Sequence, residues 1–168
     1  MNRIFFWVLT IFFTFIGQML GTDFLSIHGV FPNILLLATV FFALQLGSMQ
    51  GQWVGFILGL LADVASISIL GSQTFMFTII GNLVGRLHGQ IDEEKPIAQM
   101  TFVFASSILY FLGLLAFESF FTGSAERFGS RATYFQPIYT TLMGPIVFWV
   151  LGRWCLLQSY ISQRQEFF

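Results

Sequence analysis

The chain has 168 residues, of which 56% are hydrophobic and only 9% are charged, and its formal net charge is −1. Because soluble domains carry about 25% charged residues, this composition excludes an ordinary soluble domain and predicts an integral membrane protein. No basic patch supports nucleic acid as a partner, and none is predicted. The single cysteine, Cys155, excludes an internal disulfide and a cysteine-based metal site.

Hydropathy along the chain predicts six membrane spans, since about 20 residues cross a bilayer as a helix. The predicted spans cover residues 4–20, 31–46, 52–70, 72–87, 97–121 and 137–157. We expect one all-α membrane domain, residues 1–168, built as a compact bundle of six transmembrane helices. The first span is predicted to stay uncleaved, because no A-x-A-like cleavage site follows it.

The second span opens on Pro32 and Asn33. Proline is tolerated in a first helical turn, because the N–H that it lacks would have no partner there. Asparagine is a favoured helix cap. These residues predict a helix start, and Asn33 could also serve as a contact site.

Glycines recur every fourth residue through positions 47–59, and the next step of four is Asp63. Small residues at this spacing let two membrane helices approach closely. The first two of these glycines fall in a predicted loop, where they need only make a turn. The helix-packing candidates are therefore Gly55 and Gly59, with Gly81 and Gly85 of the fourth span as possible partners in the same chain.

Asp63 is a carboxylate within an apolar span, which is by default a functional-site hypothesis. On insertion scales such a residue costs about 2.5–3.5 kcal/mol, so it needs a compensating partner. It could cap a neighbouring helix such as the fourth, which starts at Ser72, or accept a hydrogen bond from Asn33. Binding of a partner or a ligand is the alternative. A proton relay is not favoured, because no second acid lies one helical turn away.

Basic residues predict the orientation of the chain in the membrane. With six spans, one side of the membrane holds Arg3, Arg86, Lys95, Arg153 and Arg164, and the other holds Arg127 and Arg131. Because cytoplasmic loops carry the excess of Lys and Arg, both termini are predicted to be cytoplasmic.

This orientation places four polar residues in the outer halves of their spans. They are Asn33, Asp63, Ser72 and Glu118. We expect them to converge on one outward-facing region, as a partner-binding or structural polar cluster. Ser72 is also a candidate cap of the fourth helix, and Glu118 could pair with a basic residue of the following loop.

No catalytic motif is present: the sequence has no G-x-S-x-G, no Walker A loop and no H-E-x-x-H. His28 and His88 are far apart and, with one cysteine, make no zinc-type site. The sequence thus predicts no enzyme, no catalytic residue, no metal and no cofactor.

The segment Phe31-Pro32-Asn33, the run GFILGLLAD at 55–63 and the pair Leu70-Gly71 resemble the rod shape-determining protein MreD family. The resemblance implies a non-catalytic subunit of the bacterial inner membrane that binds MreC. It further implies a functional association with RodA, with a class B penicillin-binding protein and, indirectly, with MreB filaments. Together these proteins would direct side-wall peptidoglycan synthesis and cell shape. It also implies a fold related to the S components of energy-coupling-factor transporters.

Two functions compete on this basis. The first is a scaffold that docks MreC and the synthase through apolar and glycine faces. The second is an S-component-like subunit that binds a vitamin or a lipid precursor. S components usually dock their partner through an Ala-x-x-x-Ala face on the first helix, and residues 4–16 contain no alanine. A channel is not favoured, because the inner halves of the spans carry few polar residues.

Overall fold

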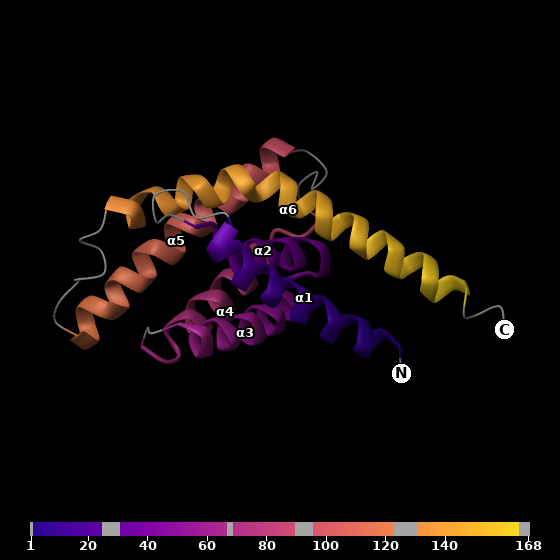
Figure 1. Cartoon of the computed structure of the whole chain (residues 1–168), viewed down its shortest axis with the longest axis horizontal. Helices are drawn as coiled ribbons and strands as arrows, with labels where there is room; N and C mark the ends of the chain where they lie inside the picture. Colours follow the sequence, from indigo (N-terminus) through magenta and orange to yellow (C-terminus); the bar gives the residue numbers. More distant parts are fainter. Residues whose placement is uncertain (1, 25–30, 67–68, 90–95, 123–130, 165–168) are drawn as a thin grey trace.

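The structure is a computed structural model that describes residues 2–24, 31–66, 69–89, 96–122 and 131–164. These residues form six α-helices and no strand, so the all-helical prediction is confirmed (Figure 1). The helices are α1 (Asn2–Phe24), α2 (Ile34–Leu46), α3 (Ser48–Ala65), α4 (Ser72–Gly85), α5 (Pro96–Thr122) and α6 (Arg131–Arg164). His28, Lys95 and Arg127 lie outside the described residues.

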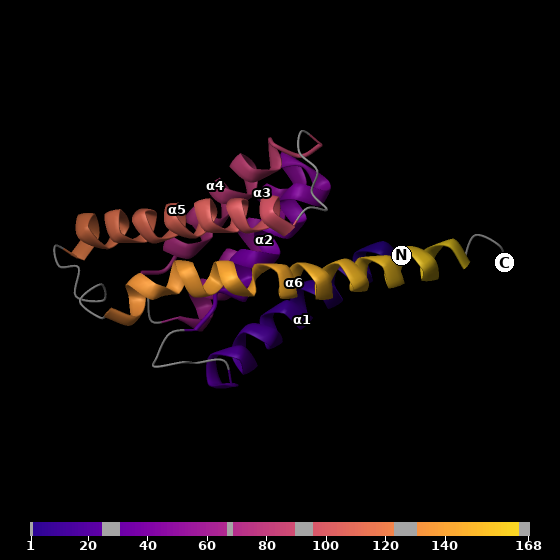
Figure 2. The same ribbon diagram turned by 90° about the horizontal axis from the view of Figure 1, so that it is seen from above.

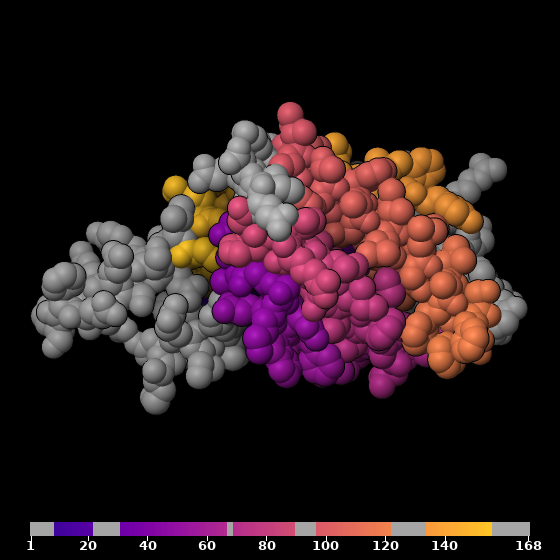
Figure 3. Space-filling model, turned by 180° about the vertical axis from the view of Figure 1, so that it is seen from behind, coloured from indigo at the N-terminus to yellow at the C-terminus, as the bar shows by residue number. Residues whose placement is uncertain are grey.

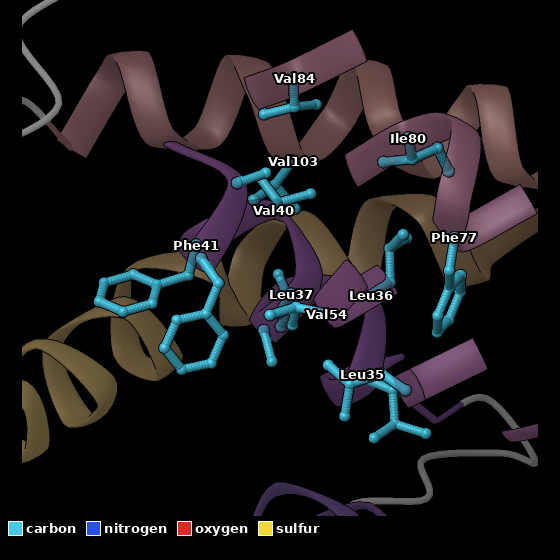
Figure 4. Packing of buried hydrophobic residues seen from close by; sticks show 14 of the residues in the cluster. Leu35, Leu36, Leu37, Val40, Phe41, Val54, Phe77, Ile80, Val84 and Val103 are labelled. Atoms are coloured by element: carbon cyan, nitrogen blue, oxygen red, sulfur yellow. The ribbon is translucent and has the colours of Figure 1, made fainter. Parts of the chain in front are cut away.

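α2 is the centre of the bundle. Ten consecutive residues, 35–44, are buried, and α2 packs against each of the other five helices. A helix that is apolar on every side is expected to be surrounded by protein or lipid. Figure 4 shows Leu36, Leu37 and Val40 of α2 in one buried cluster with Val54 of α3 and Val103 of α5. The core is therefore arranged around α2.

Successive helices run in opposite directions. In α3 and α4, Gly51 lies against Gly81 and Gly59 lies against Thr74, so the two helices are antiparallel. The pairs α2–α3, α4–α5 and α5–α6 are antiparallel in the same way. One end of the bundle, which we call the polar end, is where α2 and α4 begin and α3 and α5 finish. The amino-terminal end of α1 and the carboxyl-terminal end of α6 lie together at the opposite end (Figure 2).

The glycine faces of α3 and α4 pack against each other within the chain. A Cβ atom built on Gly51 would lie 2.7 Å from the carbonyl oxygen of Gly81, and one on Gly59 would lie 2.5 Å from the Thr74 Cα. A Cβ on Gly55 would collide with the Phe77 carbonyl, and one on Gly85 would lie 2.5 Å from the Ser48 Cα. Assigning Gly51 to a loop was wrong, because it is a central contact of this helix pair.

The helix ends differ from the predicted spans. α3 begins at Ser48 instead of residue 52, because Gly47 turns the chain at φ +85° and its carbonyl accepts from the Gly51 amide at 2.9 Å. Pro32 is not in the first turn of α2, which begins two residues later. α6 extends beyond the predicted 137–157 at both ends and continues through Pro137 and Pro145.

One described helix is long and apolar enough, by length and composition, to cross a membrane. It is α5 over Ile97–Phe121, with a mean hydropathy of 2.0. Leu9–Gly21 and Ile34–Leu46 are shorter apolar segments. The six-span arrangement and the single-domain boundaries thus stay predictions.

Candidate functional site

Asp63 holds the start of α4. Its side chain is 2% exposed, and its carboxylate accepts hydrogen bonds from the Gln73 amide at 3.1 Å, the Thr74 amide at 2.9 Å and the Thr74 hydroxyl at 2.5 Å. The first amides of a helix have no partner within the helix. The N-cap residue of α4 is Gly71, which has no side chain to supply one. Asp63 supplies it from the neighbouring helix.

This arrangement explains how a carboxylate can be buried here. An unpaired buried charge is very costly, but a helix amino terminus carries partial positive charge and free N–H donors. Both carboxylate oxygens of Asp63 are used by such donors. Of the two structural roles predicted for Asp63, the structure shows the capping of the fourth helix.

Ser72 does not cap α4, contrary to prediction. It is the first residue of the helix, and its amide donates to the Ile69 carbonyl at 3.1 Å. Its hydroxyl is buried without a hydrogen-bond partner. Because Gly71 occupies the cap position, the Ser72 side chain is one residue too late to reach the helix amides.

Gln73 extends the Asp63 site to α5. Its side-chain amide donates to the Ser66 hydroxyl at 2.6 Å, and its side-chain carbonyl accepts from the Tyr110 hydroxyl at 3.1 Å. The Tyr110 ring also packs on Phe77, with ring centroids 5.3 Å apart. The end of α3, the start of α4 and the middle of α5 are tied together by this one side chain.

Asn33 caps the start of α2. Its side-chain oxygen accepts from the Leu36 amide at 3.0 Å, which is the N-cap bond expected of asparagine. The backbone N–H of Asn33 donates to the Thr140 hydroxyl of α6 at 3.2 Å. Asn33 and Asp63 therefore cap different helices and are not bonded to each other.

Gln18 of α1 bonds the first backbone amides of α2 and was not among the predicted site residues. Its side-chain oxygen accepts from the Ile34 amide at 2.7 Å and the Leu35 amide at 3.4 Å, and its nitrogen donates to the Pro32 carbonyl at 3.4 Å. The spacing of Thr10, Thr14 and Gln18 was the available signal. All three are buried on one face of α1, and the rest of this helix is rich in phenylalanine.

Glu118 is half-buried on α5, two helical turns beyond Tyr110 towards the polar end. The four predicted polar residues thus share one end of the bundle. A pairing of Glu118 with the loop stays a prediction, because Arg127 and the Arg131 side chain are not described.

The opposite end of the α3–α4 pair carries a second polar group. The Asn82 side chain donates to Gln52 at 3.0 Å and accepts from the Arg86 Nε at 3.0 Å. The His88 ring contacts the Leu44 carbonyl at the end of α2. At this end, the side chains join α3 to α4, and His88 contacts the end of α2.

The chemistry of the polar end is that of helix capping. The side-chain oxygens of Gln18, Asn33 and Asp63 accept from backbone N–H groups, so their capacity is used inside the chain. Within the described ranges, no group of three or more His, Cys, Asp or Glu side chains could hold a metal ion. The arrangement positions the helices of the bundle.

Comparison with known proteins identifies the family. The family model of the rod shape-determining protein MreD matches residues 1–156. No curated protein and no solved structure matches the chain, so its likeness to S components stays a prediction. Since the matched region covers nearly the whole sequence, the chain belongs to the rod shape-determining protein MreD family.

Proposed function

We propose that the chain is a non-catalytic inner-membrane subunit of the elongation complex, which binds MreC and supports side-wall peptidoglycan synthesis. Family membership carries the proposal: MreD proteins are membrane proteins that determine rod shape. RodA, a class B penicillin-binding protein and, indirectly, MreB filaments are the further partners in this proposal.

In the membrane, the chain crosses six times with both termini in the cytoplasm. Two observations support the placement of both termini on one side of the membrane. Successive helices alternate in direction, and the free ends of α1 and α6 lie at the same end of the bundle (Figure 2). The described basic residue Arg86 lies at that end too, as a cytoplasmic surface requires.

The surface that meets MreC is apolar and lies outside the glycine faces. The glycines of α3 and α4 are in contact with each other's backbone, so no further helix can enter between them. Large exposed side chains cover the outer face of α5, among them Phe104, Leu112 and Phe120. Such a face suits a single membrane helix, because close packing of side chains drives helix association in lipid.

The transporter-subunit alternative finds no support in the polar end. A ligand site needs polar groups directed at the ligand. Here Gln18, Asn33 and Asp63 direct their oxygens at helix amides instead.

Co-purification tests the proposal. The tagged chain, extracted from its own membranes in mild detergent, is expected to carry MreC with it. Replacing Leu112 by Asn on the exposed face should reduce the recovered MreC, while Gly17→Ala should not. Folded, monodisperse chain that recovers no MreC would contradict the proposal.

A further inference from the structure

Three polar side chains are hydrogen-bonded in series at the end of the α3–α4 pair that lies opposite the polar end. The Asn82 side chain donates to the Gln52 side-chain oxygen at 3.0 Å and accepts from the Arg86 Nε at 3.0 Å. Gln52 and Arg86 are exposed, and the glycine contact of the two helices does not include them. Figure 3 shows the surfaces of α3 and α4 adjoining on one face of the molecule. We call these three residues the Arg86 group.

The hydrogen-bonding capacity that remains in the Arg86 group consists mainly of donors. Asn82 uses the Gln52 oxygen, and the Gln52 side-chain nitrogen bonds to no residue that the structure describes. The Arg86 guanidinium has five N–H donors, of which Asn82 accepts one. A ligand of this group must therefore accept hydrogen bonds, and the guanidinium charge favours an anion. Phosphate and carboxylate are the anions that bind a guanidinium with strong, paired hydrogen bonds.

The depth of the group favours a lipid phosphate over a carboxylate. Asn82 lies three residues before Gly85, the last residue of α4, so it is within about one helical turn, 5.4 Å, of the helix end. With the proposed cytoplasmic orientation of this end, that depth falls in the headgroup layer, which adds about 5–7 Å to each side of the hydrocarbon core. Every phospholipid supplies a phosphate there. On α3, the exposed side chains of Met49, Trp53 and Phe56 offer apolar contact to its acyl chains.

We infer that the Arg86 group binds the phosphate of an anionic phospholipid in the cytoplasmic leaflet. Arg86 supplies the charge, and Asn82 holds the Arg86 side chain in position. Arg153 of α6 is also exposed, but its side chain bonds to no residue that the structure describes. The two arginines therefore carry the same charge, and only Arg86 is fixed by a side chain. The inference rests on the proposed membrane orientation and adds a lipid-binding site to it.

Fluorescence quenching of Trp53 tests this inference, because Trp53 follows Gln52 in the sequence and is 62% exposed. In the full-length parent protein for this test, Trp7, Trp149 and Trp154 are replaced by Phe, so that Trp53 is the single reporter. The parent is reconstituted in phosphatidylcholine vesicles that contain brominated phosphatidylglycerol or brominated phosphatidylcholine of the same chain length. The measured quantity is the ratio of the binding constants of these two lipids at Trp53.

Three variants of the parent separate a specific site from general surface charge. The parent should bind phosphatidylglycerol about fivefold more tightly than phosphatidylcholine, the ratio that corresponds to ~1 kcal/mol for one basic residue near an anionic surface. Arg86→Gln should abolish this preference. Asn82→Ala should reduce it, because the charge remains but its position is no longer fixed. Arg153→Gln is the matched control and should leave the preference unchanged.

A parent without the preference would overturn the inference, as would equal losses in Arg86→Gln and Arg153→Gln. Full preference in a folded Asn82→Ala variant would also overturn it, because charge alone would then suffice. Excess inorganic phosphate at constant ionic strength should not reduce the preference, and a reduction would overturn the lipid in favour of free phosphate. Quenching by neither lipid would overturn both this inference and the proposed membrane location. Equal quenching by both lipids would overturn the inference alone.

Discussion

The Asp63 carboxylate at the end of α3 accepts hydrogen bonds from both the amide and the hydroxyl of Thr74 in α4. This pair joins two short helices whose glycine faces leave no room for side chains between them. Within the depth of a membrane, the free N–H and C=O groups at a helix end must find hydrogen-bond partners inside the protein. The residue that most suggested a binding site in the sequence is therefore a structural cap.

Replacing Asp63 should destabilise the fold in proportion to the acceptors lost. Asp63→Leu leaves buried amides of α4 without a partner and should cost about 3 kcal/mol, while Asp63→Asn keeps one oxygen and should cost about 1–2 kcal/mol. Thermal unfolding in detergent measures the stability of both variants. The readout is the labelling of the Cys155 thiol as the protein unfolds. The exposed neighbour Val64→Leu serves as control. Equal stability of all three variants would show that the cap is dispensable.

Alanine at the buried glycines should destabilise the α3–α4 pair. Gly55→Ala and Gly81→Ala push a methyl group into the backbone of the facing helix, and such overpacking costs about 1–3 kcal/mol. Gly17→Ala is the matched control, because no atom lies within 4 Å of its added Cβ. In a helix interior it should be neutral or stabilise by up to about 1 kcal/mol. In the same unfolding assay, equal unfolding temperatures for all three variants would contradict close packing of the glycine faces.

Gln18→Leu should loosen the start of α2. It removes the acceptor for the Ile34 and Leu35 amides, and the expected loss is about 2 kcal/mol. Hydrogen exchange gives a local readout: these two amides should exchange faster, with α4 amides affected less. Leu20→Met, at an exposed position one residue beyond Met19, should leave the exchange pattern intact. Unchanged protection of the two amides in Gln18→Leu would show that Gln18 does not cap α2.

Tyr110→Phe separates the hydrogen bond to Gln73 from ring packing on Phe77. The variant keeps the ring and loses the hydroxyl, so stability should fall by about 1 kcal/mol. Tyr134→Phe, where the tyrosine is 57% exposed, should change stability little. If the two variants unfold at the same temperature, the bond between α4 and α5 contributes nothing measurable.

Much of the architecture could be predicted from the sequence. Hydropathy located all six helices and their order, and glycine spacing identified the faces that pack closely. Helix ends were less predictable, because hydropathy marks what enters a membrane and not where a helix stops. α6 shows this, since its helix continues into the polar residues around Arg164. Gly51 was misplaced for a related reason: the turn is made by Gly47 alone.

The site was predicted in part. Asn33 and Asp63 were identified, because a polar group beside a helix start or in an apolar span has few roles. Gln18 was missed, because its partners are a carbonyl fourteen residues away and amides sixteen and seventeen residues away, and these contacts depend on how α1 packs against α2. Ser72 was assigned as a cap because it opens the predicted span, and nothing in the sequence shows that Gly71, one residue earlier, occupies the cap position.

The most direct test of the central claim, that the chain determines rod shape in the membrane, is cell shape after its depletion in the bacterium that encodes it. Cells should widen and become round as the protein is lost, and re-expression of the wild-type chain or Gly17→Ala should restore rods. Gly55→Leu should fail to restore them, together with a loss of folded protein in the membrane. Rods of normal width that persist after the chain has disappeared would contradict the account.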